Sequence, residues 1–97
     1  MRLTEEQMEA IRQSAREIGG ELARVCAFGS RLDDSAHGGD LMLELPESVD
    51  NPALMAAQLA ARASRALHGS KVDVLISAPN LMRLPIHDMA FQEGRLL

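Results

Sequence analysis

The sequence predicts a small α/β domain in which about three to four strands form one mixed β-sheet that packs against helices. Three observations lead to this class. Apolar residues recur at helical spacing in two long stretches, and three short runs of Val, Leu and Ile have the length of strands. The two kinds of segment alternate along the chain. A length of 97 residues suits one domain, residues 1–97, and leaves no room for a second.

The helices are predicted from their capping residues and apolar stripes. Thr4 and Gln7 have the spacing of a capping box, and Asn51 followed by Pro52 is typical of a helix start. Helices are therefore expected from Thr4 to Gly19, over residues 53–67, and from Pro85 to about Glu93. The side chains expected to face the core are Met8, Ile11, Ala15 and Ile18 in the first helix and Met55, Leu59, Ala63 and Ala66 in the second.

Strands are expected over residues 22–28, 40–45 and 71–76. In the second of these, three leucines (Leu41, Leu43, Leu45) alternate with Asp40, Met42 and Glu44. Because side chains alternate across a strand, the leucines should face one side of the sheet and the other three residues the opposite side. The last residues of the chain, Leu96 and Leu97, are expected to return to the core.

Composition excludes several classes of function. The formal charge of −4 and the scattered basic residues argue against binding to a long nucleic acid. No apolar run approaches the roughly 20 residues that span a bilayer, and the first residues do not resemble a signal peptide. The single Cys26 fits a reducing compartment, so a cytoplasmic protein is expected. Two aromatic residues give a thin core, which favours association as a homodimer or with another protein.

Three segments carry residues that suit phosphate or metal chemistry. Gly29-Ser30 follows a predicted strand, where backbone N–H groups and a hydroxyl can bind phosphate. Asp40 follows two glycines at the start of the next strand, a place where an aspartate is by default simply solvated. Asp73 lies between valines inside the third strand, where aspartate is disfavoured. The alternative for Asp73 is an edge strand on which it faces water.

Together these segments resemble a minimal nucleotidyltransferase domain of the DNA polymerase beta superfamily. The resemblance rests on Gly29-Ser30-Arg31, on Gly38-Gly39-Asp40 and on the strand from Lys71 to Ile76, and it extends over nearly the whole chain. It implies the palm-like fold of that superfamily. In that family, carboxylates on two neighbouring strands hold two Mg²⁺ ions that bridge the triphosphate of ATP or another nucleotide, and the Gly-Ser turn holds the outer phosphates.

The resemblance implies roles for five residues. Asp40 and Asp73 would be the catalytic and metal-binding residues, and Gly29, Ser30 and Arg31 would bind the nucleotide. The implied reaction is Mg²⁺-dependent transfer of a nucleotidyl group, AMP from ATP, to a hydroxyl. In the family, members of this size pair with a helical HEPN-domain protein, and some act as antitoxins that modify a tyrosine of the toxin.

The sequence departs from the family at the metal site. The family has Asp-x-Asp on the strand where this chain has Asp40-Leu41-Met42, and a thioether is a poor ligand for Mg²⁺. The missing carboxylate is either a substitution at Met42 or the result of a two-residue deletion upstream, which keeps the alternation of faces. Glu44 lies roughly 13 Å along the strand from Asp40, too far to bridge both metals.

Three hypotheses follow for the function. The first is a nucleotidyltransferase whose metal site is weakened and whose catalysis is impaired. The second is an inactive module of the same fold that binds a nucleotide or a partner. The third is a plain small α/β domain in which the motif occurs by chance, and the order and spacing of the three segments disfavour it.

Overall fold

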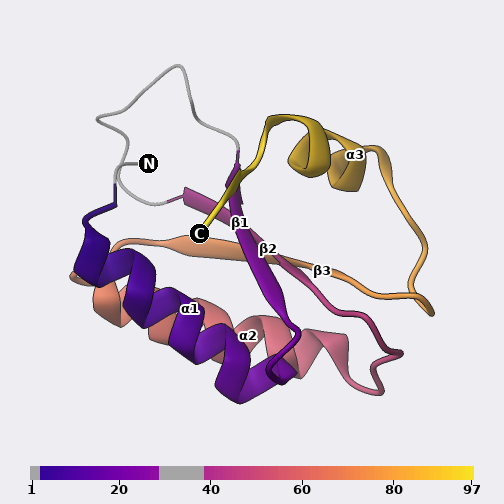
Figure 1. The fold of residues 1–97 in the computed structure, drawn as a ribbon, viewed down its shortest axis with the longest axis horizontal. Coiled ribbons are helices and arrows are strands. Elements are labelled where there is room, and N and C mark those ends of the chain that lie inside the picture. Colours follow the sequence, from indigo (N-terminus) through magenta and orange to yellow (C-terminus); the bar gives the residue numbers. More distant parts are fainter. Residues whose placement is uncertain (1–2, 29–38) are drawn as a thin grey trace.

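The computed structural model describes residues 3–28 and 39–97 of the chain, and it confirms the predicted α/β class (Figure 1). The elements follow one another as α1 (Glu5–Gly19), β1 (Arg24–Phe28), β2 (Gly39–Glu44), α2 (Pro52–Ala66), β3 (Val72–Ser77), α3 (Pro85–Glu93) and β4 (Arg95–Leu96). Within the described ranges, no helix has the length and apolar character needed to cross a membrane.

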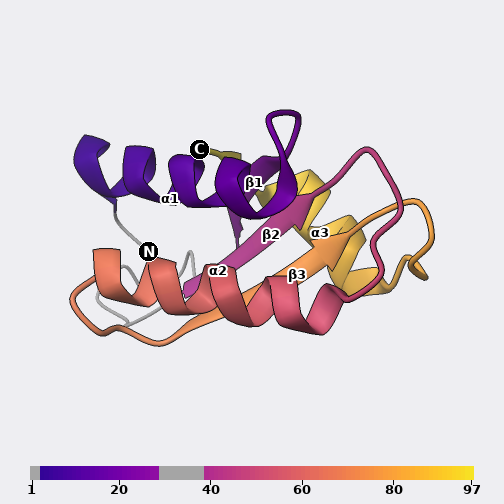
Figure 2. The same ribbon diagram turned by 90° about the horizontal axis from the view of Figure 1, so that it is seen from below.

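The four strands form one mixed sheet with the order β3-β2-β1-β4. β1 is antiparallel to both β2 and β4, whereas β2 and β3 run parallel because α2 forms the crossover between them. Helices α1 and α2 lie side by side on one face of the sheet, and α3 lies on the other face (Figures 1 and 2). The sheet is therefore covered on both faces, although α3 covers its face only in part.

The predicted helix starts are present in the structure. The Thr4 hydroxyl accepts a hydrogen bond from the Gln7 N–H at 3.1 Å, and the Gln7 side chain accepts one from the Thr4 N–H at 2.9 Å. At the start of α2, the Asn51 side chain accepts a hydrogen bond from the Leu54 N–H at 3.1 Å. These caps satisfy backbone donors that a helix leaves free at its first turn.

The main core lies between the sheet and the pair α1 and α2. The predicted alternation in β2 is confirmed, because Leu41, Leu43 and Leu45 all belong to this core. The helices contribute Ile11, Ala15, Leu59 and Ala63 to it, and Met8 of α1 is also buried, outside this cluster. Leu67, just after α2, is buried there, whereas the predicted Ala66 is only half-buried.

A second, smaller core lies under α3. Its buried members are Phe28, Met42 and Ala90, with Cys26 and Leu75 packed against them. Because the helix contributes little more than one alanine to this cluster, apolar packing alone holds α3 weakly.

His87 makes two hydrogen bonds, one within the start of α3 and one that attaches this helix to the sheet. Its ring is buried; Nδ1 accepts a hydrogen bond from the Leu84 N–H, and Nε2 lies 2.9 Å from the Ile76 carbonyl. Since Nδ1 accepts, the proton is on Nε2, which donates to the carbonyl. The neighbouring Ser77 carbonyl accepts a hydrogen bond from the Leu45 N–H, just after β2. Because successive carbonyls of a strand point to opposite sides, the Ile76 carbonyl points to the open edge of the sheet. His87 therefore donates a hydrogen bond to a backbone carbonyl that would otherwise be unpaired at the edge of the sheet.

Two predictions about the strands are wrong in detail. The first strand begins at Arg24 instead of residue 22, because Gly20 has φ 95° and ψ 170° and starts a turn that leaves Leu22 75% exposed. Leu96 was expected in the core but is 61% exposed, since it forms the edge strand β4 on the side of α3. Leu97 does pack against the main core.

Candidate functional site

The two candidate carboxylates lie side by side. Asp40 in β2 and Asp73 in β3 are direct register partners in the parallel pair. Register partners project to the same face of a sheet, and the residues that follow them, Leu41 and Val74, pack with the main core on the opposite face. Asp40 and Asp73 therefore project together from the face on which α3 lies, on neighbouring strands as the resemblance implies.

The surroundings of the pair favour a cation. Asp40 is half-buried and Asp73 is exposed. Partial burial, and then the negative charge of Asp73, raise the pKa of the Asp40 carboxyl above its ordinary value of 3.8. A cation near both oxygen groups would offset the repulsion between them and would stabilise the ionised form of Asp40.

The alternative for Asp73 also agrees with the structure in one respect. β3 is an edge strand of the sheet, and the Asp73 side chain faces water. Exposure does not separate the two interpretations, because a carboxylate that binds a metal and a nucleotide must also be open to solvent. The feature that favours a site is the second carboxylate, Asp40, directly beside Asp73.

The predicted phosphate-binding residues Gly29, Ser30 and Arg31 lie outside the described residues. The described part of β1 ends at Phe28, whose register partner is Asp40. The chain thus leaves β1 beside the carboxylate pair.

Met42 does not lie in an open site. It is two residues further along β2 on the same face as Asp40, but it is fully buried in the apolar cluster under α3. Its register partners are Cys26 and Leu75, which also pack in this cluster. A carboxylate at position 42 would therefore lie in an apolar environment unless α3 moved.

Among the described residues, no further carboxylate or histidine is grouped with the pair. Glu44 follows Met42 on the same face, and its register partners are Arg24 and Ser77 at the opposite end of β2 from Asp40. Within residues 3–28 and 39–97, no three His, Cys, Asp or Glu side chains are grouped so that they could hold a metal ion. The described part of the site is a pair of carboxylates.

Two features of the molecular surface depend on tertiary structure and are not predicted by the sequence pattern. One is the apolar outer surface of α3, and the other is a pocket at the end of β2 that is opposite to Asp40. The helical pattern of residues 85–93 gives only a weak signal for the first. No local pattern indicates the second, because its walls come from segments that are distant in the sequence.

Replacing Met42 with aspartate should destabilise the protein instead of restoring a metal site. An unpaired carboxylate in an apolar cluster costs about 3 kcal/mol or more, whereas Met42→Leu should change the free energy of unfolding by less than about 1.5 kcal/mol. Urea unfolding of both variants, with and without Mg²⁺, measures the difference. A Met42→Asp protein as stable as the wild type and further stabilised by Mg²⁺ would show that position 42 belongs to the site.

The Asp40→Asn variant should be more stable than the wild type at pH 7 in the presence of a chelator. Since the pKa of Asp40 is raised in the folded state, its ionised form opposes folding at neutral pH. This unfavourable contribution is lost as the pH falls through the folded pKa and below 3.8, so the two proteins should converge in acid. Urea unfolding at pH 7 and pH 3 tests this, with Asp50→Asn as the control. Equal stability at both pH values would contradict it.

Comparisons with known proteins assign neither a family nor a function to this site. No family model, no curated protein and no solved structure matches the chain. The candidate site is therefore defined by the positions of Asp40 and Asp73 and by the burial of Met42.

Proposed function

We propose that this chain is a nucleotide-binding domain of the nucleotidyltransferase type, with a weakened metal site. The observation that carries the proposal is the pairing of Asp40 with Asp73 on one face of the parallel strands β2 and β3. This is the arrangement that the resemblance requires of two carboxylates on neighbouring strands. The palm-like fold is part of the same proposal.

The carboxylate pair suits one Mg²⁺ ion. Mg²⁺ is usually held by one or two carboxylates together with substrate phosphates and water, and Asp40 and Asp73 offer such a set. The exposed Asp73 leaves room for phosphate oxygens. The pKa of Asp40 is raised first by partial burial and then by the negative charge of Asp73, and a cation would offset the second of these effects. When bound, Mg²⁺ would neutralise charge on the triphosphate.

The proposed reaction is transfer of AMP from ATP to a hydroxyl, and we expect it to be slow. In such a transfer the hydroxyl oxygen forms a bond to the α-phosphorus, the bond to pyrophosphate breaks, and the hydroxyl proton is released. Asp40 and Asp73 would orient the triphosphate through the cation. A site with two carboxylates in place of three should transfer roughly 10²-fold or more slowly, by analogy with the loss of other electrostatic groups.

A second candidate function is binding to a protein partner, and the surface of α3 supports it. The described residues include eight exposed large apolar side chains, and six of them lie near α3: Met82, Leu84, Ile86, Met89, Phe91 and Leu96. Arg83 lies over the Phe91 ring at 4.5 Å from its centroid. Such a concentration of apolar surface is typical of interaction sites. A helical HEPN-type protein or a second copy of the chain would be the partner.

Mg²⁺ and ATP together should raise the melting temperature of the wild-type protein, because a ligand that binds only the folded state stabilises it. The Asp73→Asn variant should lose this shift, whereas Asp50→Asn, which removes an exposed carboxylate elsewhere, should keep it. Incubation with labelled ATP and the cognate partner then measures transfer. Absence of any shift at millimolar Mg²⁺ and ATP would contradict nucleotide binding, and rapid labelling would contradict the impairment.

The double variant Ile86→Lys with Met89→Lys should weaken association. Charged side chains at these positions cannot be buried without a large desolvation cost. We expect the wild-type chain to associate at micromolar concentration, and sedimentation measures this. Leu54→Lys is the matched control, since Leu54 is an exposed leucine on α2. A wild-type protein that sediments as a monomer with a high melting temperature would count against the partner surface.

A further inference from the structure

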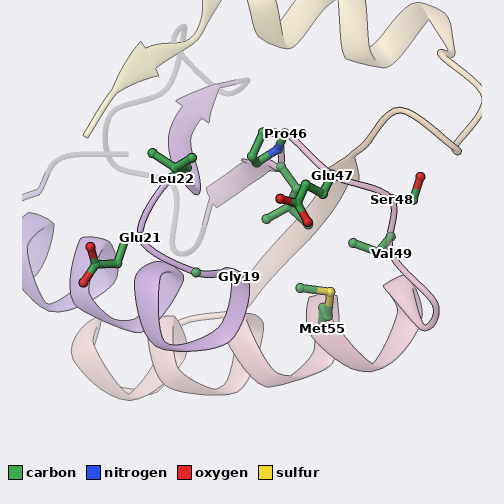
Figure 3. A pocket seen from close by; sticks show the side chains of 10 residues that line it. Gly19, Glu21, Leu22, Pro46, Glu47, Ser48, Val49 and Met55 are labelled. Carbon is green, nitrogen blue, oxygen red and sulfur yellow. The ribbon is translucent and has the colours of Figure 1, made fainter.

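A pocket of about 370 Å³ lies at the end of β2 that is opposite to Asp40. Its walls are the turn between α1 and β1, the connection from β2 to α2, and the first turns of α2. Figure 3 shows these segments around the cavity, with the Val49 and Met55 side chains directed into it. This volume is at the lower end of the range that binds small organic molecules.

The floor of the pocket is apolar. Leu45, Val49 and Met55 line it, and Leu45 is 6% exposed. Gly19 allows the floor to lie close to the end of α1, because a Cβ atom at this position would be 2.6 Å from Leu45 Cδ2. The floor thus offers a flat aliphatic surface, and the flexible methionine can adapt to a short alkyl chain.

The rim of the pocket is negative. Glu21 and Glu47 belong to its lining, and no lysine or arginine does. In Figure 3 the Glu47 carboxylate extends over the cavity, whereas the Glu21 carboxylate lies at the outer edge and points away from it. Both side chains are exposed, so each can move towards a ligand.

The carboxyl end of α1 adds to the negative potential. The last four carbonyls of a helix lack partners within the helix and form its negative pole. In α1 the Arg16 carbonyl accepts the Gly20 N–H at 2.8 Å, but no backbone N–H of the described residues bonds to the carbonyls of Glu17, Ile18 or Gly19. Because Gly19 lines the pocket, this helix pole lies at its wall.

We propose that this pocket binds a primary ammonium group carried on a short aliphatic chain. The chain would lie on Leu45, Val49 and Met55, and the ammonium group would lie near Glu47 and the end of α1. An anion would be repelled by the rim, and a neutral ligand would gain only the apolar contact. The ammonium group belongs either to a free amine or to a lysine side chain of a peptide. The site is separate from the Asp40–Asp73 pair and does not depend on the proposed nucleotide binding.

Titrations followed by ¹H–¹⁵N NMR test the proposal with three probes of equal chain length: pentylammonium, 1-pentanol and pentanoate. Pentylammonium should shift the amide signals of Gly19, Gly20 and Val49 and bind with millimolar affinity, while the other two probes should bind more weakly. Glu47→Gln should reduce the affinity for pentylammonium about two- to fivefold, the loss expected for an exposed ion pair. The matched control Glu6→Gln removes the same charge at the far end of α1 and should change nothing.

Two further comparisons complete the test. Tighter binding of Nα-acetyl-lysine N-methylamide than of pentylammonium would assign the site to a lysine side chain, and the reverse order would assign it to a free amine. The Asp73→Asn variant should bind pentylammonium like the wild type, which separates this result from any failure of nucleotide binding. Equal shifts with 1-pentanol, shifts outside the pocket, or an unchanged affinity in Glu47→Gln would each overturn the proposal.

Discussion

The parallel register of β2 against β3 determines which side chains enter the main core and which acidic residues meet on the opposite face. Residue by residue from Gly39 to Glu44, β2 pairs with β3, so that leucines and valines meet on the side of α1 and α2 while Asp40 meets Asp73 on the other side. A shift of one residue would move the leucines out of the core and the acids into it. The burial of Leu41 and Leu43, both inaccessible to solvent, therefore holds the two carboxylates together.

The face that carries the carboxylates is acidic at one end of β2 and apolar further along the strand. At one end of β2, Asp40 is half-buried beside the exposed Asp73, and two residues further on Met42 is fully buried under α3. His87 attaches that helix to β3 through its hydrogen bond to the Ile76 carbonyl. A carboxylate beside Asp40 on this strand would thus need a different position of α3. The apolar cluster at Met42 thus excludes a further acid from this position of the strand.

The small size of the core leaves large apolar side chains exposed on the remaining surface. α3 buries only His87 and Ala90, so most of its large side chains stay exposed. At the other end of the sheet, the absence of a side chain at Gly19 lets Leu45 approach the end of α1 and leaves a shallow pocket beside it. A thin core thus leaves apolar surface in two places, near α3 and at the end of α1.

The sequence by itself determined the features that depend on neighbours along the chain. The helix caps at Thr4 and Asn51 and the alternation in β2 could be predicted, because they follow from local hydrogen bonds and from the periods of helix and strand. The meeting of Asp40 with Asp73 was implied only by the family resemblance, because it depends on the parallel register of β2 and β3. Tertiary structure alone decided the burial of Met42, the role of His87 and the exposure of Leu96. Each of these depends on where α3 and β4 lie relative to the sheet. A local pattern shows that a residue faces one side of a strand, but it does not show what covers that side.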